Sequence, residues 1–341
     1  MTPPLPRLPG LDLARALALC GMVLVSFHLA SASSDLSSWL DRLIAMLQGR
    51  PAALFVTLAG LGIGLGSKGM RWRQAAARTA RRGLFLFILG LANTLLFPAD
   101  ILHFYGAFFL IAALCLRLPS SLLLMVVMGL ADLFVTLLFV FDYPAGWRWQ
   151  DLSYPDFWQP LGFARNLLFN GWYPVVPWLA FLLLGLWLSR FDLASPRVRG
   201  LLLTGGVAAA VLAKAGSLLL SALFPAWDSL FALEPMPPLP LFLLSAAGIA
   251  CALIALCLLL GDSVVLRPLL PMGRQTLTLY LLHLPFVTLL TALDATAWQS
   301  LLAAGLWLWL AALAAGWWQR HRGRGPLEAL MRRLCDRRMP Q

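Results

Sequence analysis

The chain has 341 residues, of which 60% are hydrophobic and only 12% are charged. Soluble globular domains are about 45–50% apolar, so this composition excludes an ordinary soluble protein and indicates one that lies in a membrane. The formal net charge of +11 would suit a nucleic-acid partner, but the positive charges are spread over many short segments between apolar runs. Membrane orientation and attraction to anionic lipid explain that distribution. We therefore expect membrane lipid as a partner and no nucleic acid.

In chain order, ten apolar runs are each long enough to cross the roughly 30 Å hydrocarbon core of a bilayer. The sequence therefore predicts an all-α, polytopic membrane helix bundle, with one transmembrane domain over residues 1–318 and a basic tail over 319–341. Within the tail, apolar and basic residues alternate at helical spacing, as in a helix that lies on the inner membrane surface. The predicted spans are 12–32, 51–67, one ending near 97, one ending near 117, 120–141, 173–189, 200–223, 238–260, 275–292 and 299–318.

Basic residues divide unequally between the two sets of loops. Of the 26 Lys and Arg residues, 21 lie in or beside alternate loops that begin with the N-terminus, and four lie in the other loops. Nine of the 15 carboxylates lie in those Arg-poor loops. Because cytoplasmic loops carry an excess of Lys and Arg, both ends of the chain are predicted to lie inside.

Three histidines are predicted to lie between the membrane midplane and the outer face. Ionisable groups at such depth are costly and are therefore functional candidates. His103 follows Asp100 by three residues, so the two side chains share one face of a helix that begins at or before Asp100. The carboxylate could orient the imidazole as a base, cap the helix, or do both. His28 and His283 are the other two, although a lone membrane histidine is more often a helix–helix hydrogen-bond partner.

Two further features inside the predicted spans favour structural roles. Asp132 and Lys214 lie at similar predicted depth in the fifth and seventh spans, so we expect a buried ion pair rather than a proton relay. Glycine occupies every second position from 60 to 66 in the second span. These glycines superficially resemble a nucleotide-binding loop, but small residues in a span more often allow close helix packing.

The longest predicted outer loop, residues 142–171, is rich in aromatic side chains. Aromatic residues gather at membrane interfaces in any case, but a connector this long is often functional. Flat aromatic faces beside Asp151, Asp156 and Arg165 would suit a sugar or a similar polar acceptor. The candidate acceptor contacts in and just after this loop are Trp147, Trp149, Trp158, Asn170, Trp172 and Tyr173.

Five sequence blocks follow one another from the first span to the ninth: LDLARALA (11–18), RPAALFVTLAG (50–60), DILHFYG (100–106), NGWYPVVPWL (170–179) and GRQTLTLYLLH (273–283). Their content and order resemble the transmembrane acyltransferases, which include the heparan-alpha-glucosaminide N-acetyltransferase family, the YeiB-like proteins and the acyltransferase-3 group. One departure stands out. Those families place a His or Asn about fourteen positions after the first-block Asp, where this chain has Ser26; His28 comes two residues later, about 200° around the helix.

The resemblance implies acyl transfer from cytoplasmic acyl-coenzyme A, expected to be acetyl-coenzyme A, to an acceptor on the outer side of the bacterial cytoplasmic (inner) membrane. The reaction is then expected in an outward-facing polar cavity formed by the first, second, fourth and ninth spans, with His103, oriented by Asp100, as the favoured base. His283 would line the donor path or stabilise charge, and His28 would have a supporting role. Ser26 is a substrate-side candidate, and Arg50 could stabilise the oxyanion or bind an anionic acceptor. No metal is expected. The candidates for the coenzyme A phosphates are Arg71, Arg73, Arg267 and Arg274, joined by Arg50 on the donor path.

Two alternatives remain open at this point. A proton-coupled transporter of a small solute would also use ten spans, titratable histidines, and an intramembrane Asp132 and Lys214. A purely structural membrane protein is the third interpretation. A transporter should depend on a counter-ion without binding acyl-coenzyme A, and an acyltransferase should do the opposite. The acyl group, the acceptor and the oligomeric state, including association of identical copies, are not fixed by the sequence.

The topology predicts which single cysteines a membrane-impermeant thiol reagent reaches in intact cells. Single cysteines at Ser34, Ser153 and Ser229 lie in predicted outer loops and should be labelled. One at Ser195 lies in a predicted inner loop and should not be labelled. Mass-shift labelling with and without permeabilisation measures this. Labelling of the Ser195 variant alone would invert the orientation.

Overall fold

The computed structural model describes residues 8–31, 38–261 and 263–336, so Ser34 lies outside the described residues. Every regular element among those residues is a helix, which confirms the all-α class. Six helices are long and apolar enough to cross a membrane, or up to eight if each bent pair of helices forms one span. The chain is therefore an all-α helical membrane protein. The count of ten spans and the orientation stay predictions.

The described residues fall into two compact units, and each is described by itself. Unit 1 comprises the described residues within 8–58, 192–208 and 248–330, and unit 2 comprises those within 59–191, 209–247 and 331–336. Four helices have residues in both units: α3 (Arg50–Ser67), α9 (Pro196–Leu223), α10 (Pro240–Leu260) and α14 (Pro326–Cys335). The single transmembrane domain expected from the sequence stays a prediction.

Unit 1 is organised around α1 (Pro9–Leu29), which contacts α11, α12 and α13. Pro9 opens α1 because proline has no N–H to leave unpaired in the first turn. The hydroxyl of Thr296 and the side chain of Gln299 form a reciprocal capping box that begins α13. The remaining helices of this unit are α2 (Ser38–Leu47), η3 (Arg267–Leu269), α11 (Leu270–Arg274), α12 (Thr276–Ala292) and α13 (Ala297–His321).

A buried carboxylate joins α1 to α11 within unit 1. Asp12 is 3% exposed and accepts hydrogen bonds from Arg15 Nη1 at 2.8 Å and from Arg274 Nε at 2.9 Å. A side chain at Gly273 would overlap the backbone of Asp12, so the two helices meet backbone to backbone. The first and last of the five sequence blocks therefore pack directly on each other.

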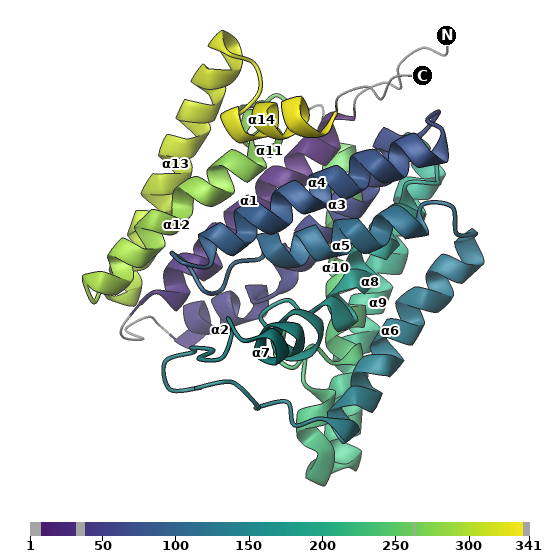
Figure 1. Cartoon of the computed structure of the whole chain (residues 1–341), viewed down its shortest axis with the longest axis vertical. Coiled ribbons are helices and arrows are strands. Elements are labelled where there is room, and N and C mark those ends of the chain that lie inside the picture. The colour runs from purple at the N-terminus through teal and green to yellow at the C-terminus, as the bar shows by residue number, and fades with distance from the viewer. Residues whose placement is uncertain (1–7, 32–37, 262, 337–341) are drawn as a thin grey trace. The chain divides into compact units, whose positions relative to one another are not determined.

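Unit 2 is built on the antiparallel pair α4 (Trp72–Asn93) and α5 (Leu102–Cys115), which lie side by side in Figure 1. Two glycines make this approach close. A Cβ atom at Gly90 would overlap the backbone of Leu102 and His103, and one at Gly106 would overlap the backbone of Phe87. The other helices are α6 (Ser120–Val140), α7 (Pro160–Arg165), η1 (Asn166–Asn170), α8 (Val175–Leu188) and η2 (Pro225–Phe231).

The glycine series of the second predicted span also lies at a helix contact. A Cβ atom at Gly60 would overlap the carbonyl oxygen of Leu182, and one at Gly64 would overlap Ser189, so α3 packs closely on α8. The prediction of a small-residue packing surface is confirmed.

The expected buried pair of Asp132 and Lys214 is wrong. Both side chains are exposed, on α6 and α9. No ion pair joins them among the residues that the structure describes. Similar depth along two helices does not make their side chains face each other, and both helices keep most of their surface exposed.

The basic tail forms the predicted helix, α14. The carboxylate of Glu328 accepts hydrogen bonds from the backbone N–H groups of Leu277 and Thr278 and from the Thr278 hydroxyl at 2.6 Å. A carboxylate is favourable at this place because the first turn of α12 leaves N–H groups unpaired. Contact of α14 with the inner membrane surface stays a prediction.

The α4–α5 contact predicts a strong position dependence of glycine substitution. Gly90→Ala should lower the melting temperature because its methyl group overlaps the backbone of His103, and overpacking of this kind costs about 1–3 kcal/mol. The matched control is Gly129→Ala on α6, where no atom lies within 4 Å of the added Cβ. Thermal denaturation in detergent compares them. An unchanged melting temperature for Gly90→Ala would contradict the close contact.

Candidate functional site

Asp100 organises the turn between α4 and α5. It is fully buried, and its Oδ2 accepts hydrogen bonds from the backbone N–H groups of Leu102 at 2.7 Å and His103 at 3.3 Å. Its Oδ1 accepts one from Asn93 Nδ2 at 2.8 Å. The carboxylate thus caps the first turn of α5 and ties it to the end of α4, which is the capping role that the sequence allowed.

His103 lies one turn after this carboxylate and is 1% exposed. Its Nδ1 lies 3.6 Å from Asp100 Oδ2, which is ion-pair range but longer than a hydrogen bond. Neither ring nitrogen has a hydrogen-bond partner among the described residues. Because buried polar atoms are rarely left unpaired, both nitrogens are available to a bound molecule, and Asp100 is close enough to orient the ring.

Aromatic side chains enclose His103 within unit 2. The ring of Phe104 lies 3.9 Å from the imidazole centroid, and the edge of Phe157 approaches at 5.8 Å. Phe157 belongs to the long loop, and Tyr173, just after that loop, meets Phe104 at 6.1 Å. The loop therefore covers the histidine.

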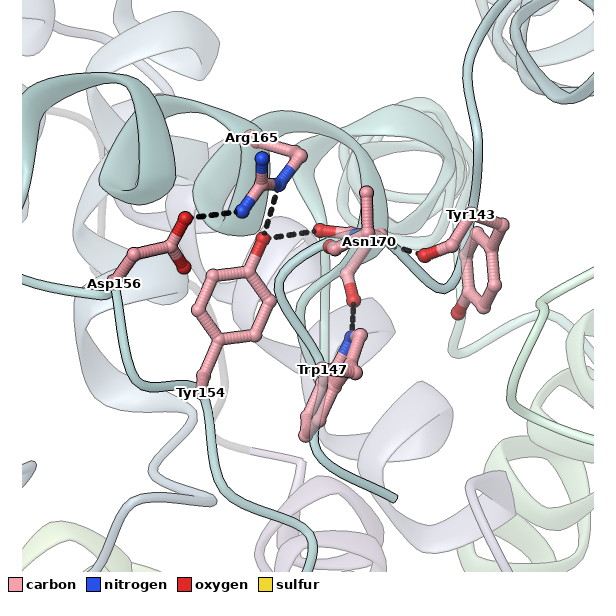
Figure 2. A network of polar contacts seen from close by, with 7 residues as sticks. Tyr143, Trp147, Tyr154, Asp156, Arg165 and Asn170 are labelled. Carbon is pink, nitrogen blue, oxygen red and sulfur yellow. Dashed lines mark hydrogen bonds and ion pairs between the residues drawn. The ribbon is translucent and has the colours of Figure 1, made fainter.

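A polar network anchors this loop, as Figure 2 shows. The buried Asn170 donates from Nδ2 to the carbonyl oxygens of Tyr143 and Ala145 at 2.7 and 2.8 Å. Its Oδ1 accepts from the Tyr154 hydroxyl at 2.8 Å, and its backbone oxygen accepts from Trp147 Nε1 at 2.6 Å. Asn170 was expected to contact the acceptor, but its side-chain amide is occupied in holding the loop.

Arg165 extends the network. It donates to the Tyr154 hydroxyl at 2.7 Å and to Asp156 Oδ2 at 2.5 Å (Figure 2). Burial raises the pKa of Tyr154 above its ordinary value, although the hydrogen bond from Arg165 opposes the shift. The phenol is therefore protonated at neutral pH and can donate to Asn170.

A cavity of about 360 Å³ opens beside the network. Of the residues expected to contact the acyl acceptor, Trp147 alone lies in the lining of this cavity. The Trp149 ring stacks on the Trp147 ring at 5.1 Å, and the Trp172 ring packs edge-on against it at 5.4 Å. Trp158 is 62% exposed and packs on Phe157. The lining residues are Gly146, Trp147, Arg148, Gln150, Pro155 and Asp156.

His283 belongs to unit 1 and is fully buried. Its Nδ1 is hydrogen-bonded to the carbonyl oxygen of Tyr280, which requires that Nδ1 carry the proton, and its Nε2 has no partner among the described residues. Phe27 stacks on it at 6.4 Å, and Trp307 approaches edge-on at 5.9 Å. The unprotonated Nε2 makes this ring a second candidate base.

The other candidates of unit 1 are less enclosed. Ser26 and His28 are half-buried on α1, on either side of Phe27, and the Nδ1 of His28 has no hydrogen-bond partner in the described part of the chain. Arg50 is half-buried at the start of α3 and donates to the carbonyl oxygen of Gln48 at 3.3 Å. The structure thus describes Asp100 and His103 in one unit and His28, Arg50 and His283 in the other.

The arginines expected to bind the coenzyme A phosphates differ in exposure and in whether they already form a hydrogen bond. Arg71 and Arg73 of unit 2 and Arg267 of unit 1 are exposed. Arg274 already donates to Asp12. The guanidinium of Arg274 therefore serves α1–α11 packing in this structure.

Three residues of these surroundings had no clear signal in the sequence. Asn93 lies in an apolar helix end, seven positions before the carboxylate it binds. Phe157 is one aromatic residue among many in the loop. Asp12 was noted within the first block but not for its bond to Arg274, 262 positions later.

Family profiles cover almost the whole chain. The profile described as "Heparan-alpha-glucosaminide N-acetyltransferase, catalytic" matches residues 7–223, and "Protein of unknown function (DUF418)" matches residues 187–338. The first match includes Asp100, His103 and the complete aromatic loop. No protein with a curated function matches the chain.

The loop anchor predicts a specific effect of Asn170→Asp. The carboxylate cannot donate to the part-buried carbonyl oxygens of Tyr143 and Ala145, so both anchoring hydrogen bonds are lost. Limited proteolysis should cut the 142–159 segment faster. Gln150→Glu makes the same chemical change at an exposed loop position and should leave the rate unchanged. Equal rates for both variants and the unmodified protein would contradict the anchoring role.

Proposed function

Because the chain belongs to the heparan-alpha-glucosaminide N-acetyltransferase and YeiB-like superfamily of membrane proteins, we propose that it is a membrane acyltransferase. The proposed reaction moves an acyl group, in the first instance acetyl, from cytoplasmic acyl-coenzyme A to a polar acceptor such as a sugar. The acceptor lies on the outer side of the bacterial cytoplasmic membrane.

One observation carries the proposal within unit 2. A buried histidine with two unpaired ring nitrogens lies 3.6 Å from a buried carboxylate, under an aromatic loop. His103 accepts the proton of the attacking hydroxyl or amine as that group bonds to the thioester carbonyl carbon. The carbon–sulfur bond then breaks, and the departing thiolate takes the proton that His103 had accepted, which regenerates the neutral imidazole. The positions of Asp100 and His103 favour a base that the carboxylate orients and whose charged form it stabilises.

The cavity beside the loop anchor supports a sugar-like acceptor. Trp147 offers a flat apolar face, and Arg148, Gln150 and Asp156 offer donors and acceptors in the same lining. Ligand sites commonly combine an apolar wall with a few polar groups in this way. Phe157 follows Asp156 directly and contacts His103, so the cavity wall and the covered histidine share one loop segment.

The chain offers exposed cations that fit the phosphates of acyl-coenzyme A. Arg71 and Arg73 carry exposed guanidinium groups at the predicted cytoplasmic start of α4, and Arg267 does so in unit 1. Phosphates and guanidinium groups pair well. Arg274 is a weaker candidate because Asp12 engages it.

His283 is the alternative base, supported by the tautomer that Tyr280 imposes. A role for His28 or Ser26 would be through substrate contact from α1. The transporter alternative loses the buried relay that Asp132 and Lys214 would have supplied, because both are exposed.

Substitution of His103 tests the base assignment. His103→Ala should reduce acyl transfer by roughly a hundredfold or more, the usual scale for a lost general base. Asp100→Asn should reduce it less, because it disturbs orientation rather than removing the base. The measurement is release of free thiol from acetyl-coenzyme A by proteoliposomes loaded with glucosamine or another hexosamine.

His321→Ala is the matched control, because that histidine is exposed in the last turn of α13. It should leave the rate unchanged. Near-normal turnover of His103→Ala with loss in His283→Ala would move the base to α12. If neither substitution matters and no acetyl-coenzyme A binds, the acyltransferase assignment fails.

A further inference from the structure

Two side chains of opposite charge are exposed within predicted spans. Asp132 is the one ionisable residue of α6, and Lys214 is the one ionisable residue of α9 beyond Arg199. In the most apolar stretch of each helix, only 11% of the residues of α6 and 17% of those of α9 are buried. A charge that faces hydrocarbon is costly, and such residues normally pair or face a polar space. The described part of the chain supplies neither charge with a partner at ion-pair distance.

Both charges lie at one level of unit 2 and point outward. Phe134, two residues after Asp132, packs against Leu239. Gly216, two residues after Lys214, faces Leu241, to which its Cβ would lie at 3.7 Å. Leu239 directly precedes α10 and Leu241 lies in its first turn, so neighbouring residues at the beginning of α10 lie near both helices. Two residues turn a helix by about 200°, so Asp132 and Lys214 face away from α10.

The residues exposed around each charge lie on one face of their helix. On α6 the exposed positions recur at three- and four-residue intervals, and open space lies beyond Gly129. On α9 they recur in the same way on both sides of Lys214. Small residues on these faces let a second helix approach closely. The exposed positions are Met125, Met128, Gly129, Thr136 and Phe139 on α6 and Val211, Ala215, Leu218 and Leu219 on α9.

We propose that two copies of this chain associate through the α6–α9 face, with Asp132 of one copy paired to Lys214 of the other. A two-fold axis makes such a contact self-complementary, because each copy supplies one acid and one base and two equivalent pairs form. The complementary charges at one level select a second copy over lipid. The proposal stands independently of the acyltransferase assignment.

Charge reversal tests the pairing. Asp132→Lys alone and Lys214→Asp alone place like charges opposite each other and should weaken dimerisation by about tenfold or more. The double variant with both changes restores opposite charges and should recover the dimer. The measurement is the monomer–dimer equilibrium of the full chain in lipid nanodiscs or in detergent, by light scattering or mass photometry.

Cross-linking between differently tagged copies tests the geometry without relying on charge reversal. One copy carries Asp132→Cys and the other Lys214→Cys, in a chain whose five native cysteines are replaced. A short bismaleimide should give a covalent dimer that carries both tags. Leu302→Cys, 71% exposed on α13, replaces Lys214→Cys in the control and should give none.

Three results would overturn the proposal. The first is a chain that is monomeric in membranes at all concentrations. The second is a dimer that withstands both single reversals, or that the double reversal fails to restore. The third is the absence of a covalent dimer from the two singly substituted copies while a chain carrying both Asp132→Cys and Lys214→Cys is cross-linked within itself, which would show an internal pair.

Discussion

The hydrogen bonds of Asp100 fix the part of the molecule on which the proposed chemistry depends. This one carboxylate pairs the free amides at the start of α5 and holds Asn93 at the end of α4. Gly90 brings the two helices into backbone contact at the same level. With both ends of the turn held, the His103 ring has little freedom, and the carboxylate that shapes the turn is also the one nearest its Nδ1. A buried charge would be destabilising alone, but three donors compensate it here.

A single residue, Asn170, likewise makes most of the hydrogen bonds that hold the aromatic loop. Asn170 uses its side-chain amide and its backbone oxygen to hold segments that lie 16 to 27 positions earlier in the chain. This places Phe157 over His103 and leaves the Trp147 face beside a cavity. The loop thus buries the histidine under Phe157, while the neighbouring residue Asp156 lines a cavity with polar groups. Both properties favour transfer of an acyl group over its loss to water.

Much of this could be predicted from sequence because membranes restrict the choices. The thickness of the hydrocarbon core sets the length of the apolar runs, and the helices lie where these runs do. The glycine series follows from close helix packing. The i,i+3 relation of Asp100 and His103 needs only helical geometry. Which side chains of different segments face each other could not be predicted from the sequence. The bonds of Asp12 to Arg274 and of Asn170 to Tyr143, and the outward direction of Asp132 and Lys214, depend on how helices rotate against one another. Hydropathy does not report that rotation.

The proposed acyltransferase activity requires that a buried histidine of this chain act on a thioester. The most direct measurement incubates the purified protein in detergent with acetyl-coenzyme A radiolabelled in the acetyl group. It then follows bound label, free acetate and acetylated hexosamine together. We expect the protein to bind label and to transfer it to hexosamine, and we expect His103→Ala to bind label but to transfer little. Absence of bound label in the unmodified protein, with no acetate released, would contradict the proposed activity.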